Sequence, residues 1–328
     1  MSIGLLRRYD QVSAPKVWAN AYGSLVDLLQ AVLVDGYGAY AGLGWTKEYE
    51  SPDTNTIVFR NNPTTGTGVY LQASHSDAFG CATNFFSMKL YESMSAWNTG
   101  LSPCPTSGIL ATGRVGSTTG TTCTDGIHWM IVGDDKGFWL CLRPYLSANA
   151  NITGQNAGRY WEVYYIGDYV KMSPDYVWNC FVSGESALTI SSSVFGTCQA
   201  FDTSYVKYWC MRDSTSQIGA MNVGIAAGSS YETAVIGKTS DVSPVNNQTW
   251  YTPVFIHDQN SKVLGMFPGC RNPLRKAGDH GVQNYSQFDE EYSMVDRTLH
   301  LLQYRSISET TVFPRIAIIS GEGFRDVL

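Results

Sequence analysis

The chain has 328 residues, of which only 15% are charged, while 20 are Tyr, 9 are Trp and 32 are Gly. Its formal net charge of −6 disfavours nucleic-acid binding, because a protein that meets phosphates needs a basic surface. Low charge with many aromatic residues is typical of proteins buried in an assembly, since interface cores are depleted in Lys and Glu. A β-protein with many turns accounts for the same composition equally well.

Several classes of protein are disfavoured by local patterns. No apolar run reaches the length of about 18 residues that a membrane span requires. The N-terminus lacks the apolar stretch and small-residue cleavage site of a secretory signal. The eight Cys residues contain no Cys-x-x-Cys pair, so we expect no zinc site and interpret most of them as core thiols. Disulfides formed outside the cell are the alternative.

The first predicted element is an amphipathic helix that begins near Ser24, a plausible N-cap, and stops at Gly36. Its apolar stripe consists of Leu25, Leu28, Leu29, Val32 and Leu33. Strands are predicted over residues 45–49, 57–60, 69–72 and 84–92, the second and third forming a hairpin. Residues 98–126 are expected to be loop, with a Gly/Ser/Thr tract at 113–124.

The central feature is a predicted hairpin over residues 127–142, with the Gly/Asp-rich turn Gly133-Asp134-Asp135-Lys136-Gly137. Both arms are apolar at nearly every position, which indicates strands covered on both faces. Trp129, Ile131, Phe138 and Leu140 should therefore be buried, with residues 134–137 at the solvent or at a neighbouring subunit. Strands at 160–166 and 177–183 should extend this hairpin into an antiparallel meander.

The C-terminal half is predicted to contain further short strands and a tail. The expected strands are residues 205–212, 217–227, 250–256, 262–268, 298–304 and 310–319, with residues 320–328 as the tail. The fold class is thus mostly β, with antiparallel, sandwich-like sheets, one short N-terminal helix and few other helices. We expect residues 1–185 to form one β-rich domain and residues 186–328 to complete it or pack beside it.

No motif predicts a catalytic, cofactor or metal site. The pair Asp134-Asp135 could bind a metal or act in acid–base chemistry, but turn formation explains it better. Asp279-His280 lies in a loop without a Ser or Cys motif, and residues 113–120 lack the Gly-Lys-Ser/Thr ending of a phosphate loop. Asn151 and Asn247 match glycosylation acceptors, and Asp289-Glu290-Glu291 is interpreted as a solvated acidic face.

Four segments of the N-terminal half resemble a family of tailed-bacteriophage virion structural proteins. They are residues 22–38 with Gly44-Trp45-Thr46-Lys47, Tyr91-Glu92-Ser93-Met94-Ser95 with Asn98-Thr99-Gly100 and Pro103, residues 129–140, and Tyr165-Ile166-Gly167-Asp168-Tyr169 with Ser173-Pro174-Asp175. The likeness covers roughly residues 15–185. It implies a non-enzymatic part of the particle, encoded among capsid, neck and tail genes, and it transfers no catalytic residue.

We therefore predict a virion structural component, located at the tail, baseplate, neck or head surface and assembled in the host cytoplasm. Its partners would be copies of itself and other virion proteins, without nucleic acid, membrane span or cofactor. The first alternative is a receptor- or glycan-binding module, whose exposed aromatic rings would stack on a host surface sugar. The second is a glycan hydrolase, which would need two carboxylates facing a cleft.

Overall fold

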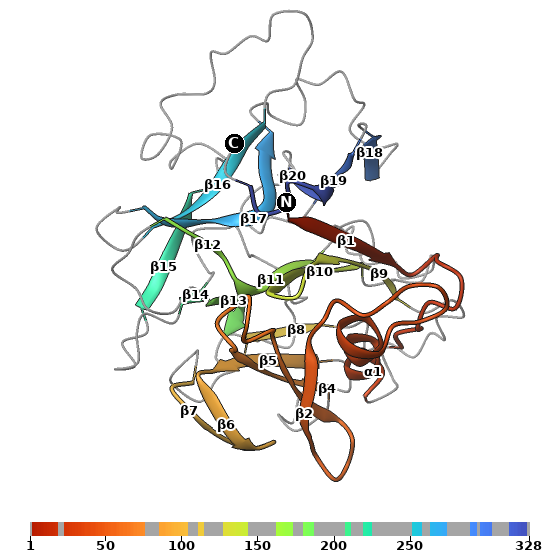
Figure 1. The fold of residues 1–328 in the computed structure, drawn as a ribbon, viewed down its shortest axis with the longest axis vertical. Helices are drawn as coiled ribbons and strands as arrows, with labels where there is room; N and C mark the ends of the chain where they lie inside the picture. Colours follow the sequence, from red (N-terminus) through yellow and green to blue (C-terminus); the bar gives the residue numbers. More distant parts are fainter. Residues whose placement is uncertain are drawn as a thin grey trace, which may run out of the picture.

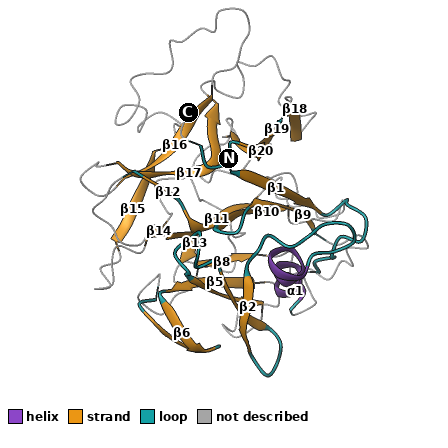
Figure 2. Cartoon of the chain, viewed as in Figure 1, coloured by secondary structure: helices purple, strands orange, loops and turns teal. Residues whose placement is uncertain are grey.

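The computed structural model describes part of the chain. It covers residues 2–18, 23–75, 85–103, 111–114, 127–143, 162–172, 180–186, 207–210, 219–224, 251–257, 263–273, 289–293, 296–303 and 315–326. Within these ranges the fold is mostly β, with antiparallel sheets and one short helix, which confirms the predicted fold class (Figure 2). No helix in the described ranges is long and apolar enough to cross a membrane.

A ring of antiparallel strands forms the main body (Figure 1). In order around the ring they are β1 (Ile3–Arg8), β9 (His128–Gly133), β10 (Gly137–Arg143), β11 (Glu162–Asp168), β13 (Cys180–Ser186), β14 (Lys207–Cys210), β15 (Gly219–Gly224), β16 (Tyr251–His257), β17 (Val263–Pro273) and β20 (Arg315–Glu322). The ring closes because β20 pairs with β1, where Ile3 lies opposite Glu322. Closure leaves these strands without a free edge.

Three further strands are attached to the ring. The short β12 (Val170–Lys171) pairs with β17, so that β17 has β16 on one side and both β12 and β20 on the other. Next to β20 lies β19 (Arg297–Gln303), which in turn pairs with β18 (Asp289–Ser293). The C-terminal strands therefore pair directly with strands from the N-terminal half.

A second sheet branches from the ring at β13. It runs through β8 (Ala111–Arg114), β5 (Phe85–Tyr91), β4 (Tyr70–His75), β3 (Thr56–Arg60) and β2 (Thr46–Glu50), all antiparallel. The predicted hairpin of β3 and β4 is confirmed. A separate ribbon, β6 (Ser93–Ala96) with β7 (Thr99–Leu101), lies at the lower left of Figure 1. The predicted loop over residues 98–126 is thus wrong at β7 and β8.

The helix α1 (Ser24–Gln30) continues into one π-helical turn, η1 (Ala31–Asp35), and ends at Gly36, which has a positive φ of 79°. All five residues of the predicted stripe are buried in the core. The predicted cap is wrong, because Ser24 is the first helical residue and its hydroxyl is hydrogen-bonded to the backbone of Trp18. The positive φ of Gly23 turns the chain into the helix instead.

The central hairpin is confirmed as β9 and β10, with Trp129, Ile131, Phe138 and Leu140 fully buried. Its two faces contact different layers. On one face Trp139 packs against Phe267 of β17, with ring centroids 5.4 Å apart. On the other, Phe138 meets the edge of Trp45, just before β2, at 5.4 Å. The hairpin is buried on both sides because it is shared between the ring and the second sheet.

The meander beyond the hairpin is confirmed as β11 and β13; of the strand predicted over residues 177–183, residues 180–183 are described, and they lie in β13. Two described cysteines, Cys141 of β10 and Cys270 of β17, are fully buried, as expected for core-filling residues. The predicted tail is wrong in its first part: β20 extends to Glu322, and Phe324 is fully buried. The segment after β20 also takes part in a polar junction with the central hairpin.

Candidate functional site

The turn between β9 and β10 lies at this junction, and Asp134 shapes it. Its carboxylate oxygen Oδ1 accepts hydrogen bonds from the backbone N–H groups of Lys136, at 3.0 Å, and Gly137, at 3.1 Å. The N–H of Asp134 donates to the carbonyl of Gly137 at 3.0 Å. This is the local bonding for which Asp is favoured in turns, so the interpretation of Asp134 as a turn-forming residue holds.

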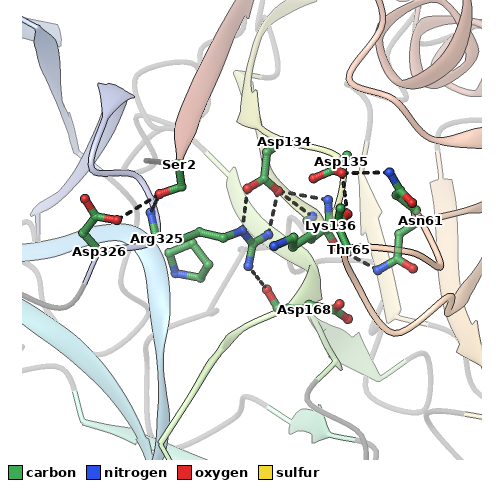
Figure 3. Close-up of polar contacts among 12 residues, drawn as sticks. Ser2, Asn61, Thr65, Asp134, Asp135, Lys136, Asp168, Arg325 and Asp326 are labelled. Carbon is green, nitrogen blue, oxygen red and sulfur yellow. Dashed lines mark hydrogen bonds and ion pairs between the residues drawn. The ribbon is translucent and has the colours of Figure 1, made fainter.

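The same carboxylate also binds Arg325 from the C-terminal segment (Figure 3). Arg325 Nη2 donates to Asp134 Oδ1 at 2.6 Å and Nε donates to Oδ2, a planar two-point contact that suits a guanidinium. The third nitrogen, Nη1, donates to the carbonyl of Asp168 at 2.6 Å. Burial alone would lower the pKa of Arg325, but Tyr165, Asp134 and Asp168 raise it above its ordinary value. Arg325 is therefore a fixed cation.

The neighbouring Asp135 faces the loop between β3 and β4. Its Oδ2 accepts hydrogen bonds from the side chains of Asn62, at 2.9 Å, and Thr65, while its carbonyl accepts from the N–H of Asn62 at 2.9 Å. Asn61 of the same loop donates from Nδ2 to the carbonyl of Lys136 at 3.0 Å. The turn was predicted to reach solvent or another subunit. Residues 134–136 are half-buried, because the chain's own loop and C-terminal segment contact the turn.

Asp168, at the end of β11, is the most deeply buried carboxyl group of the junction. Its two oxygens accept the N–H of Thr67, at 2.7 Å, and the hydroxyl of Thr67, at 2.6 Å. Burial raises the pKa of Asp168 to about 6, and the bonds from Thr67 and the charge of Arg325 oppose this rise. A Cβ at Gly66 would lie 2.8 Å from Asp168 Oδ2, so only glycine permits this approach.

The junction also joins the two ends of the described chain. The hydroxyl of Ser2 accepts the N–H of Arg325 at 2.7 Å and donates to the carboxylate of Asp326 at 3.2 Å. The carbonyl of Ser2 accepts the N–H of Gly323 at 3.0 Å. Between them, the ring of Phe324 is buried against Gly4 and Gly269, where an added Cβ would lie 2.6 and 2.5 Å from the ring.

The carboxylates of Asp134, Asp135 and Asp168 all make contacts that hold parts of the fold together. Asp134 is neutralised by Arg325, Asp135 holds a loop, and Asp168 is almost inaccessible to solvent. Among the described residues no group of three His, Cys, Asp or Glu side chains could hold a metal ion. The junction therefore closes the fold and presents no accessible acid–base pair.

A second polar pair, which the sequence did not single out, lies on the neighbouring strands β19 and β20. His300 Nε2 and Ser320 Oγ are 2.8 Å apart, a spacing at which a histidine can activate a serine nucleophile. However, His300 is only 2% exposed and Ser320 only 6%. A substrate could not reach this hydroxyl, so the pair is a buried hydrogen bond between strands.

None of the other sequence candidates is among the described residues whose contacts build this junction. Asp279-His280 and both glycosylation acceptors, Asn151 and Asn247, lie outside the described residues. Of residues 113–120, only Gly113 and Arg114 are described, and both lie in β8. Asp289, Glu290 and Glu291 lie in β18.

Arg325, Asp168 and Thr67 were not predicted as site residues. Arg325 was assigned to a tail and Thr67 to a polar loop, and nothing near them in the sequence marks a partner. Asp168 gave only one signal, the Gly167-Asp168 step after a predicted strand. Comparison of the sequence with models of known protein families and with curated proteins finds no match.

Proposed function

We propose that this chain is a non-enzymatic structural component of a tailed-bacteriophage virion and that it acts through contacts between subunits. The observation that carries the proposal is the composition, with 15% charged residues, 20 Tyr and 9 Trp, together with the resemblance of residues 15–185 to phage structural proteins. Aromatic-rich, charge-poor surfaces are those that protein–protein interfaces favour.

The polar junction supports a structural role over a catalytic one. A glycan hydrolase needs two carboxyl groups about 5–10 Å apart that face a sugar in an open cleft. At the junction, Asp134 is ion-paired, Asp135 is hydrogen-bonded to a loop, and Asp168 is buried beneath Thr67. None of these three groups is placed to protonate a glycosidic oxygen.

Exposed apolar side chains on the described surface also support an assembly role. They are Ile3 and Leu5 on β1, Val12 in the loop that follows, Leu101 on β7, and Met172 and Val263 near β12 and β17. Single exposed apolar residues are common on any protein. Here they occur on a chain in which few residues are charged. Burying these side chains between subunits would therefore take few charged groups out of water.

The proposal is tested by mass spectrometry and antibody labelling of purified particles from the phage that encodes the chain. We expect the protein in stoichiometric amounts with the capsid and tail proteins, and labelling at one defined position. Its absence from washed particles would overturn the proposal. Specific binding on a glycan array would instead favour the receptor-binding alternative, and hydrolysis that a single Asp or Glu substitution removes would favour the hydrolase.

A further inference from the structure

The strand β1 closes the ring, and it is held there mainly through its backbone. Ile3 pairs with Glu322 of β20, and the last four residues of β1 pair with β9. None of its apolar side chains is fully buried, because Ile3 is 51% exposed, Leu5 is 36% exposed and Leu6 is half-buried. A strand that buries so little apolar area can leave its sheet at a low cost in free energy.

The one buried side chain of β1 that is longer than a hydrogen atom belongs to Arg7, and it is an imperfect anchor. Arg7 is 6% exposed and donates to the carbonyls of Leu6, at 2.8 Å, and Ala41, at 2.6 Å. Its Nε has no hydrogen-bond partner among the described residues. Burial lowers the pKa of Arg7, as expected for a cation that has lost part of its hydration. The side chains of β1 therefore add little to its backbone pairing.

The segment after β1 contains more chain than the sheet requires (Figure 1). Arg8 lies opposite Met130 of β9, and Val17 lies opposite Ile127. The first pair of positions is nine residues from the second along this segment but only three along β9, so six residues are surplus and form a loop. Six residues span roughly 20 Å when extended. A straightened loop could thus carry β1 to an adjacent copy while Val17 stays in place.

The closed loop is strained at one position. Ser13 has a φ of 64°, in the left-handed region that residues other than glycine rarely adopt. The adjacent Val12 is 80% exposed, so this conformation does not bury its side chain. An extended loop would release the strain at Ser13. Strained hinge loops favour the exchange of an element between copies of a chain.

Other contacts of the loop oppose its opening. The side-chain oxygen of Gln11 accepts hydrogen bonds from the N–H of Arg8, at 3.0 Å, and from the hydroxyl of Tyr37. Asp10 forms an ion pair with Arg8 at 2.6 Å. These contacts must break before the loop can straighten, so they slow exchange. The backbone pairing of β1 itself is not lost, because it forms again in the ring that receives the strand.

We propose that β1 is an exchangeable strand, and that the position between β9 and β20 receives β1 from a second copy of the chain. The second copy fits because its β1 has the same register and the same Gly4, where an added Cβ would lie 2.6 Å from the ring of Phe324. This inference rests on the proposed function and names the way in which subunits are linked. Each copy gives one strand and receives one, so exchange joins copies in pairs or in closed rings.

The test co-expresses two variants of the full chain, one with Ile3→Cys and the other with Glu322→Cys. Facing residues of antiparallel strands lie within reach of a disulfide. A bond between positions 3 and 322 therefore joins two chains only when β1 of one chain pairs with β20 of the other. After oxidation, non-reducing electrophoresis detects the joined chains and peptide mass spectrometry locates the bond. We expect a dimer that carries the bond between positions 3 and 322.

The matched control co-expresses Thr56→Cys with Ser74→Cys. These residues face each other on β3 and β4, and their hydroxyl oxygens are 2.9 Å apart. Neither strand is proposed to exchange, so this pair should not join two chains. When both substitutions of a pair are placed in one chain, the disulfide should form within that chain, which shows that the geometry of each pair permits the bond.

Two further variants test the loop as the hinge. Deleting residues 10–15 removes the surplus chain, and we expect the cross-link between chains to be lost. Ser13→Gly removes the strain of the closed loop without shortening it, because glycine adopts a positive φ readily. We expect Ser13→Gly to reduce the fraction of cross-linked chains at least twofold. Thermal unfolding shows whether each variant is folded, and Ser13→Gly tests the hinge even where the deletion prevents folding.

Absence of the cross-link between chains, while the same bond forms within a single chain, would overturn the inference. An equal yield from the control pair would also overturn it, since random contact would then explain the bond. Cross-linking that Ser13→Gly leaves undiminished would exclude this loop as the strained hinge. The protein's presence in purified particles is measured separately, so the virion role can stand when exchange fails, or fail when exchange stands.

Discussion

Arg325 binds Asp134 through two hydrogen bonds across 191 residues of sequence, at a place where both side chains are largely buried. This pair links the last described residues to the turn of the central hairpin, while Ser2 ties the N-terminal segment to the same residues. The described chain is therefore closed at one point, where both ends, the central turn and the β3–β4 loop meet (Figure 3).

Replacing Arg325 should destabilise the fold strongly. Arg325→Ala leaves the carboxylate of Asp134 buried without its cation, and we expect a loss of about 3–5 kcal/mol in the free energy of unfolding. Urea denaturation measures this loss as a lower transition midpoint. The control is Arg8→Ala, which removes the more exposed pair with Asp10 and should cost less than about 1 kcal/mol. Similar losses in the two variants would contradict a stabilising role for the buried pair.

Asp168 should make stability fall as pH rises. Burial raises its pKa from 3.8 to about 6, so in this range the folded chain binds the proton more strongly than the unfolded chain. Its contribution is complete below about pH 4 and is lost as pH increases through 6. A shift of this size corresponds to a change of up to roughly 3 kcal/mol between the two limits. Unfolding of Asp168→Asn, measured over the same pH series, should lack this change; identical pH profiles would refute the assignment.

His75 should make stability fall as pH decreases, which is the opposite of the effect of Asp168. Burial lowers its pKa from 6.5 to about 4, and its Nδ1 accepts the N–H of Leu25 at 3.3 Å. The unfolded chain therefore binds the proton more strongly between these values, and stability is lost as pH falls from 6.5 toward 4. His75→Gln keeps an acceptor for Leu25 but cannot titrate. We expect its unfolding midpoint to be less acid-sensitive than that of the parent chain, and an unchanged acid sensitivity would exclude His75 as the cause.

Gly4 and Phe324 should be energetically coupled. A Cβ on Gly4 would lie 2.6 Å from the Phe324 ring, so Gly4→Ala should cost about 1–3 kcal/mol by overpacking. Phe324→Leu removes the plane of the ring and leaves space for the new methyl group. The double variant should therefore lose less stability than the sum of the two single variants. Strict additivity in thermal unfolding would show that the C-terminal ring does not pack against β1 in solution.

Within the central hairpin, replacing Trp139 should destabilise the fold much more than replacing Asp135. Trp139 is fully buried and its Nε1 donates to the carbonyl of Pro268 at 2.7 Å, so Trp139→Ala should cost about 3–5 kcal/mol. Asp135→Asn keeps an acceptor oxygen for Asn62 and Thr65 and should cost about 1 kcal/mol or less. Both are measured by chemical denaturation. Loss of assembly in Asp135→Asn with unchanged stability would show that the turn is a functional contact.

The sequence by itself determined the elements whose pattern is local. An unbroken apolar run on each side of Gly133-Asp134-Asp135-Lys136-Gly137 identified a hairpin buried on both faces. The stripe from Leu25 to Leu33, followed by Gly36, identified the helix. The short strands β7 and β8 were missed because they are only three and four residues long and contain Gly or Ala, which have weak strand propensity. Their pairing with β6, β5 and β13 is a tertiary effect.

Only the tertiary structure decided which strands meet and which charges pair. The alternation of apolar and polar residues along a strand indicates which side chains face the core. It does not indicate which strand pairs with it, because backbone hydrogen bonds are the same for every partner strand. Nothing local could therefore pair β1 with β20 and close the ring. Likewise, an Arg in an apparent tail and an Asp in a turn look solvated until the closed chain buries them together. Burial then makes Arg325 and Asp134 depend on each other, since neither charge is stable there alone.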